Sequence, residues 1–302
     1  MSTLEQLRQF TTIVADTGDF NVLREYTPQD GTTNPSHILH AAKLPQYRTI
    51  IEQAAKYGQS KSQDPILQAE HALLRLLVGF GNEILHAIPG RVSTEVDPVH
   101  SFDTAKTVEM ARSIIDLYRE TGVSKERVLI KIASTWEGFQ ACKILESEGI
   151  YCNMTLLFSP VQAKLAVENR FPERDYIGIK DPGVQLVTEI HNYYKENSIK
   201  TEIMAASLCS FDECIQLAGV QLMTINVKLL EELKHASYPV CRHLADRKAM
   251  NPIPSMRNSN EACFRFDMFS DRMASEKMAE SLRLFLDDGQ ELKRILLEAL
   301  SA

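Results

Sequence analysis

The sequence lacks the features of a membrane protein, a nucleic-acid-binding protein or a secreted disulfide scaffold. No apolar run is long enough to cross a bilayer, and the polar segment Met1–Phe10 has no signal-peptide core. The net charge is −7 at pH 7 and no basic patch stands out, which disfavours nucleic-acid binding. We therefore expect a cytoplasmic protein that acts on small molecules and has neither nucleic-acid nor membrane partners.

Metal-binding and redox motifs are also scarce. The six cysteines form no CxxC pair, which is typical of reduced thiols in a cytosolic protein. His37 and His40 lie three residues apart on an expected helix, but no third ligand is near, so a partly exposed helix face is the more common explanation. No glycine-rich phosphate loop occurs. We expect no metal and no cofactor.

The chain does contain an alternation of short apolar runs with longer amphipathic stretches. Segments 107–118 and 182–194 carry apolar residues at helical spacing. Strand followed by helix, repeated, is the signature of a parallel sheet, and hydrophobic residues make up 44% of the chain, enough for one large core. The expected strands are 11–17, 31–33, 91–97, 128–134, 153–159, 176–179, 202–207 and 222–226. Eight such units predict an α/β fold, a single (β/α)8 TIM barrel.

The end of the chain departs from this alternation. Residues 236–262 are rich in proline and asparagine and predict an irregular connection. From Asp271 the pattern is helical again, first around Met278–Leu286 and then, as a last helix, around Leu292–Leu300. We expect residues 1–302 to form a single domain, with 236–302 supplying the connection and additional C-terminal helices that pack on the barrel.

One lysine is especially informative. Lys131 lies in the apolar run 128–134, and a buried lysine with a lowered pKa can attack a carbonyl to form a Schiff base. A strand-end lysine that reaches solvent or a salt bridge is the alternative. Because polar residues at the C-terminal ends of barrel strands face one cavity, several others should join it. They are Asp16, Asn34, Glu95, Asn153, Thr155 and Ser207.

Five segments, in order, carry a family resemblance. They are Val14–Asp19, Thr32–Ser36, Ser93–Asp97, Leu129–Trp136 and Asn153–Ser159, with weaker matches at Phe264–Phe266 and Asp271–Ala274. Over nearly its whole length the chain resembles the transaldolases, enzymes that make and break carbon–carbon bonds through a lysine Schiff base on a (β/α)8 barrel.

The resemblance implies a role for each candidate residue. Lys131 would form an imine with a sugar or ketone donor of the dihydroxyacetone type, and an aldehyde would be the acceptor. Asp16 would act as general base on the C4 hydroxyl, while Glu95 and a water held by Thr155 would move protons during imine formation. No metal is needed, because the protonated imine takes the place of a Lewis acid. The implied substrate-binding residues are Asn34, Asn153 and Ser207.

The chain departs from the family pattern where two arginines would bind the substrate phosphate. Cys209 stands two residues after Ser207, where one arginine is expected. The region after Ser159 is shortened, and Lys180 is the nearest cation to the other position. A cysteine does not replace a bidentate guanidinium, so we expect altered substrate specificity, with Lys180 as a further substrate-binding candidate.

Two alternatives stay open. The protein could be an ordinary pentose-phosphate transaldolase that uses sedoheptulose 7-phosphate and glyceraldehyde 3-phosphate, with Lys180 or Arg174 contacting the phosphate. It could also be a non-catalytic barrel kept for binding, although the joint presence of the four catalytic candidates argues against this. The sequence does not fix the oligomeric state, and a homodimer is compatible with it.

Overall fold

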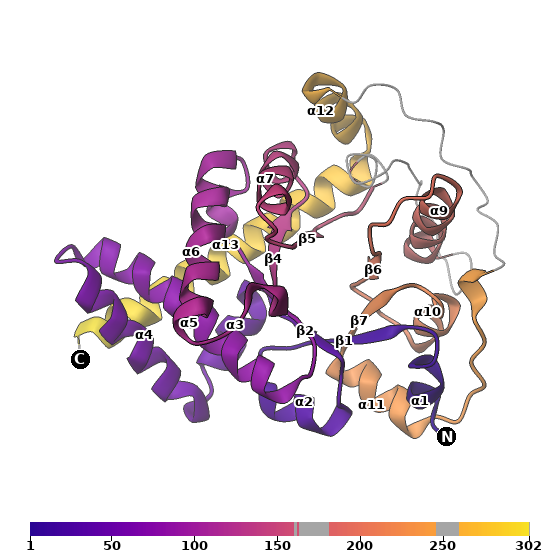
Figure 1. Cartoon of the computed structure of the whole chain (residues 1–302), viewed down its shortest axis with the longest axis horizontal. Helices are drawn as coiled ribbons and strands as arrows, with labels where there is room; N and C mark the ends of the chain where they lie inside the picture. Colours follow the sequence, from indigo (N-terminus) through magenta and orange to yellow (C-terminus); the bar gives the residue numbers. More distant parts are fainter. Residues whose placement is uncertain (160–161, 163–180, 246–259, 302) are drawn as a thin grey trace. The chain divides into compact units, whose positions relative to one another are not determined.

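The computed structural model describes residues 1–159, 162, 181–245 and 260–301. The chain divides into two compact units that are interleaved along the sequence. Figure 1 labels the helices and strands and colours them in sequence order. Unit 1 comprises Met1–Asp16, Pro28–Asp30 and Leu157–Met278, and unit 2 comprises Thr17–Thr27, Gly31–Leu156 and Ala279–Ala302. Among the helices of the described ranges, none is long and apolar enough to cross a membrane.

Unit 1 is built on three parallel strands. Strand β7 (Leu222–Asn226) lies between β1 (Thr12–Asp16) and β6 (Met204–Ala205), and the register places Asp16 opposite Asn226. Apolar side chains such as Val14 and Met223 are fully buried, so these strands form part of the core. The helices of unit 1 are α1 (Thr3–Leu7), α9 (Pro182–Glu196), α10 (Phe211–Gln216), α11 (Val227–His235) and α12 (Glu261–Ser270), with the 3-10 turn η5 (His243–Ala245).

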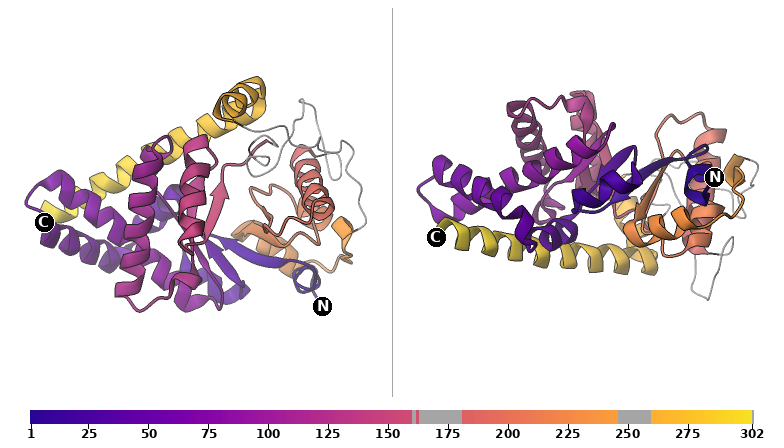
Figure 2. Two further views of the ribbon diagram at one scale, coloured as in Figure 1. Left: turned by 45° about the horizontal axis from the view of Figure 1, so that its top comes forward. Right: turned by 90° about the horizontal axis from the view of Figure 1, so that it is seen from below.

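Unit 2 carries strands β2 to β5 in the parallel order β5-β4-β3-β2. They are β2 (Asp30–Thr32), β3 (Val92–Glu95), β4 (Val128–Ala133) and β5 (Cys152–Thr155). All six residues of β4 are buried, as expected for a strand covered on both faces. Helices α6 (Thr104–Glu120) and α7 (Trp136–Ser147) lie side by side against these strands (Figure 2). The other elements of unit 2 are α2 (Phe20–Tyr26), α3 (Pro35–Ala42), α4 (Arg48–Lys61), α5 (Pro65–Ala87), and the 3-10 turns η1 (Pro45–Tyr47), η2 (Pro98–His100) and η3 (Lys125–Arg127).

Several helices begin directly after a strand because the connecting residue is a good N-cap. Asn34 caps α3, Thr135 caps α7 and Asn226 caps α11, each accepting a hydrogen bond from a backbone N–H in the first turn. Short strand-to-helix connections of this kind hold the residues at the strand ends in fixed positions.

The predicted fold class is confirmed in its main features: parallel strands alternate with helices, and further helices follow at the C-terminal end. Strand 202–207 is reduced to two residues in β6, and strand 153–159 ends at Thr155, because Leu156 takes a left-handed φ of 58°. The predicted strand 176–179 lies outside the described residues. The single-domain arrangement of residues 1–302 stays a prediction.

The C-terminal segment differs from the predicted pair of helices. One continuous helix, α13 (Arg272–Ser301), replaces them. Gly289 does not interrupt it, because a single glycine inside a helix costs only about 1 kcal/mol relative to alanine. Helix α12 begins earlier than expected, at Glu261, where the Asn260 side chain accepts a hydrogen bond from the N–H of Cys263. Within unit 2, α13 contacts the strand-end segments through Lys293, whose ammonium lies 2.9 Å from Asp97 Oδ2.

Candidate active site

Lys131 and Glu95 form a buried ion pair in unit 2. They are register partners on β4 and β3, so their side chains leave the sheet on the same face. Lys131 Nζ lies 3.2 Å from Glu95 Oε2, and the two side chains are 9% and 5% exposed. Burying one of these charges alone would be costly, so each needs the other. The salt bridge offered as the alternative to a reactive lysine is therefore present, but its acid is itself a catalytic candidate.

A hydrogen-bond network extends from this ion pair to both neighbouring strands. Lys131 Nζ donates to the carbonyl oxygen of Thr33 at 3.0 Å, and Thr33 N–H donates to the Ser93 carbonyl at 3.3 Å. The Ser93 hydroxyl in turn accepts from Asn153 Nδ2 at 3.1 Å. Sequence reasoning did not single out Thr33 or Ser93. Ser93 was recognisable because it lies two residues before Glu95 and so on the same strand face.

Asn153, Thr155 and Asn34 occupy the surrounding strand ends of unit 2. Asn153 is the register partner of Lys131 on β5, and Thr155 lies two residues further along the same face. The Asn34 side-chain oxygen accepts from the His37 N–H at 2.8 Å, so its amide NH₂ group is the part suited to contact a ligand. Unit 2 thus brings five of the predicted residues to the C-terminal ends of its strands.

The remaining described candidates, Asp16 and Ser207, belong to unit 1. Asp16 ends β1, half-buried, opposite Asn226 at the end of β7. Asn226 Nδ2 donates to the Leu208 carbonyl at 3.4 Å, which attaches the end of β7 to the segment that carries Ser207. Ser207 is exposed and has a left-handed φ of 59°. The sequence predicts Asn226 as a strand end but not as a site residue, because an asparagine before a helix is equally well explained as an N-cap.

The position expected to hold a phosphate-binding arginine lies in an acidic setting. Cys209 is exposed, and its backbone N–H donates to Glu213 Oε2 at 2.9 Å. The other Glu213 oxygen accepts from the Ser210 hydroxyl at 2.9 Å, so the carboxylate is held in place beside Cys209. A phosphate dianion placed here would meet a negative charge. Lys180 and Arg174 lie outside the described residues.

This arrangement suits amine chemistry. A lysine can attack a carbonyl only after it loses a proton, and Glu95 is within direct reach to accept it. The Thr33 carbonyl fixes the direction of the amine, because it accepts one of its hydrogen bonds. Unlike an exposed lysine, Lys131 is held in one geometry by groups on two other strand ends.

Comparison with known proteins agrees with this chemistry. Residues 13–296 match the family model described as transaldolase/fructose-6-phosphate aldolase. The chain is 48% identical over 310 residues to the transaldolase of Saccharomyces cerevisiae, covering 95% of this chain and 92% of the yeast protein. It is 44% identical over 318 residues to transaldolase B of Pasteurella multocida, covering 99% of this chain and 100% of that protein. The transaldolase of Shewanella amazonensis is 44% identical over 315 residues, with 98% of both chains covered.

These alignments are longer than the part of this chain that they cover. With the yeast protein, 95% of 302 residues is about 287, so about 23 of the 310 aligned positions have no residue here. With the Pasteurella protein, 99% is about 299 residues, which leaves about 19 of 318 positions empty. At those aligned positions each relative has a residue and this chain has none.

The full-length matches confirm the family predicted from the five motifs, the TIM-barrel type of α/β fold and the enzyme class. The chain belongs to the transaldolase/fructose-6-phosphate aldolase family and is an enzyme of the transaldolase type.

Proposed function

We propose that this protein transfers a dihydroxyacetone-type unit from a ketose donor to an aldehyde acceptor through a Schiff base at Lys131, with substrate choice shifted away from phosphorylated sugars. The observation that carries the proposal is the buried Lys131–Glu95 ion pair, with Nζ also held by the Thr33 carbonyl. The names of the relatives support the transfer reaction. The cytoplasmic location and a homodimeric assembly stay predictions.

The reaction begins with imine formation. Glu95 takes a proton from the Lys131 ammonium, and the free amine attacks the donor ketone. Glu95 then returns a proton, through a water that Thr155 holds, so that the carbinolamine loses water and becomes a protonated imine. The Asn153 amide, already oriented by Ser93, is suited to bind a donor hydroxyl beside this carbon.

Carbon–carbon cleavage follows from the protonated imine. Asp16 removes the proton of the C4 hydroxyl, the C3–C4 bond breaks, and its electron pair moves into the iminium nitrogen. The aldehyde product leaves and an enamine stays on Lys131. The enamine then adds to the acceptor aldehyde, Asp16 returns its proton, and hydrolysis releases the new ketose. Asn34 and Ser207 would bind donor hydroxyls.

Specificity is the finer part of the proposal. A phosphate held by arginine gains charge-assisted hydrogen bonds, each worth roughly 1.5–3 kcal/mol, so loss of one contact weakens binding by about ten- to a hundredfold. Cys209 has at most a weak donor, and the Glu213 carboxylate is fixed beside it. We therefore expect poor use of fructose 6-phosphate and erythrose 4-phosphate.

The test is the ratio of kcat/KM for a phosphorylated substrate to kcat/KM for its unphosphorylated counterpart. Cys209→Arg should raise this ratio, and a further Glu213→Gln change should raise it more, because it removes the repelling charge. Cys263→Arg is the matched control, since it adds the same charge at another exposed cysteine. If the natural enzyme strongly prefers the phosphosugar, it is an ordinary pentose-phosphate transaldolase, and Lys180→Ala is the next variant.

A further inference from the structure

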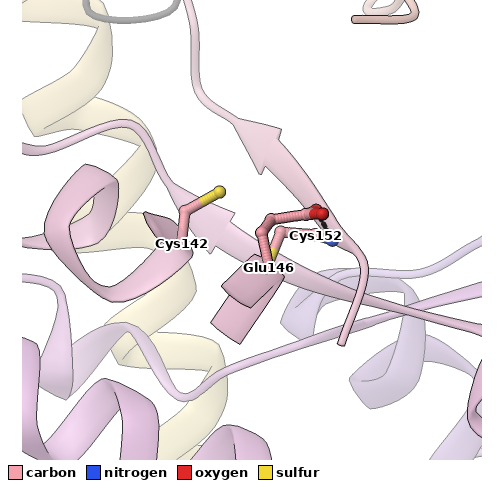
Figure 3. Close-up of side chains that lie close together, drawn as sticks. All are labelled: Cys142, Glu146 and Cys152. Carbon is pink, nitrogen blue, oxygen red and sulfur yellow. Dashed lines mark hydrogen bonds between the residues drawn. The ribbon is translucent and has the colours of Figure 1, made fainter. Parts of the chain in front are cut away.

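A second cluster of reactive side chains lies in unit 2. Cys142 and Glu146 are one helical turn apart on α7, and Cys152 is the first residue of β5. The two sulfur atoms and a Glu146 carboxylate oxygen all lie within 4.8 Å of one another. Figure 3 shows the three side chains gathered where the end of α7 meets β5. The chemistry described above uses none of them.

The connection between α7 and β5 fixes this grouping. Gly149 takes a φ of 70° and turns the chain back toward the strand. The backbone N–H of Cys152 then donates to Glu146 Oε1 at 2.7 Å, which ties the end of the helix to the start of the strand. The thiols are partly buried and the Glu146 side chain is exposed, so the cluster opens to solvent on the carboxylate side.

The two sulfur atoms lie within 4.8 Å of each other, so two thiolates at these positions would repel one another. A cation between the two sulfur atoms would remove their mutual repulsion.

We propose that Cys142, Cys152 and Glu146 bind a thiophilic divalent cation of the Zn²⁺ type. Two thiolates and a carboxylate are ligands that zinc accepts, and water can complete a tetrahedron on the open side. With Zn–S bonds of about 2.3 Å, the sulfur atoms of a tetrahedral site lie about 3.8 Å apart. The observed separations of at most 4.8 Å lie within about 1 Å of this value. Each thiol releases its proton to solvent as the metal binds.

The site would be separate from the candidate active site. Successive side chains of a strand alternate in direction, so Cys152 points away from the face that carries Asn153 and Thr155, toward α7. The cation would tie α7 to β5 without contacting Lys131. A ligand that binds only the folded state stabilises it, so zinc should raise the melting temperature without being required for turnover.

The experiment uses the reduced full-length protein titrated with Cd²⁺ and followed by thiolate-to-metal charge-transfer absorption, with Zn²⁺ added as competitor. The wild type should bind one more Cd²⁺ per chain than the double variant Cys142→Ser/Cys152→Ser. The difference in charge-transfer absorption should correspond to two cadmium-bound thiolates. Cys263→Ser, at an exposed cysteine on α12, should match the wild type. Zinc should raise the melting temperature of the wild type and of Cys263→Ser but not that of the double variant.

Glu146→Gln gives a second readout if the double variant does not fold. The amide oxygen can still accept the Cys152 N–H, but the charged ligand is gone. Loss of an outer-shell partner lowers metal affinity by about 10–100-fold, so loss of this direct ligand should lower zinc affinity by at least as much. The two-thiolate cadmium band should remain. Equal metal binding by wild type and double variant overturns the proposal. So does a reduced wild type that shows no two-thiolate band, or an unchanged zinc affinity in Glu146→Gln.

Discussion

The Lys131 ammonium lies 3.2 Å from the Glu95 carboxylate, and both side chains are almost fully buried. Such a pair is weak support for stability, since burying two charges costs about as much as their attraction returns. Its presence at adjacent strand ends is better explained by chemistry. In the proposed mechanism Glu95 is the group that accepts the Lys131 proton when the substrate carbonyl arrives.

Glu95→Gln should slow imine formation more than carbon–carbon cleavage. The amide cannot take the lysine proton, and loss of a general acid–base group typically costs about 10²–10⁴-fold. The rate of imine appearance in stopped-flow mixing with donor measures this step. The assignment is wrong if the variant forms the imine at the wild-type rate.

Asp16→Asn should have the opposite signature. Because Asp16 is proposed to act after the imine has formed, borohydride should still trap the donor on the variant. Release of the aldehyde product should fall by about 10²–10⁴-fold. Equal, small effects on trapping and on aldehyde release would show that Asp16 is not the base for cleavage.

Lys293→Ala should destabilise the protein. The Asp97 side chain is only 8% exposed, and its Oδ2 lies 2.9 Å from Lys293 Nζ on α13, so the variant leaves this shielded carboxylate without that partner. We expect a loss of about 1–3 kcal/mol in the free energy of unfolding, measured by urea denaturation. Arg294→Ala is the control, because the Arg294 pairs with Glu291 and Glu298 lie on the exposed face of the same helix. Equal losses of unfolding free energy in both variants would show that the Asp97–Lys293 contact contributes no more to stability than an exposed ion pair does.

The pH dependence of stability should include a contribution from His191. Burial, followed by the positive charges of Lys195 and Arg242, lowers the pKa of His191 in the folded protein. The unfolded chain, with a histidine pKa of about 6.5, then takes up the proton at a higher pH than the folded protein does. This contribution is complete above the unfolded pKa and is lost as the pH falls toward the folded pKa.

His191→Gln should therefore lose less melting temperature than the wild type between pH 7.5 and pH 5, in thermal unfolding followed by circular dichroism. Identical slopes in the wild type and His191→Gln would contradict the account.

Much of the site could be predicted from sequence because strand ends are marked by short apolar runs. The run around Lys131 and the alternation at Glu95 place both residues correctly on adjacent strands. The contact from Lys131 to Thr33 was not predictable, because it uses a backbone carbonyl that no side-chain pattern reveals. The proximity of Cys142 and Cys152 was missed because nine residues lie between them in the sequence and a turn at Gly149 brings them together.

At the C-terminal end, local signals competed. The apolar pattern predicted two helices, but helix α13 continues through Gly289, since nothing else in that stretch stops a helix. The start of α12 had a readable signal, because Asn260 is a good N-cap and precedes a helix-forming run. The prolines and asparagines before it predicted an irregular connection up to residue 262, which takes in the first two residues of α12, since that helix begins at Glu261.

The most direct measurement is borohydride reduction of the protein with dihydroxyacetone, fructose and fructose 6-phosphate, followed by peptide mass spectrometry. With at least one donor, reduction should add that donor irreversibly to Lys131. Lys131→Met and Lys131→Arg should show neither adduct nor activity. Methionine has no amine, and the arginine guanidinium stays protonated and does not attack. Lys106→Met, at an exposed lysine on α6, should behave as the wild type does. Absence of an adduct on Lys131 with every donor, together with full activity of Lys131→Met, would contradict the Schiff-base mechanism.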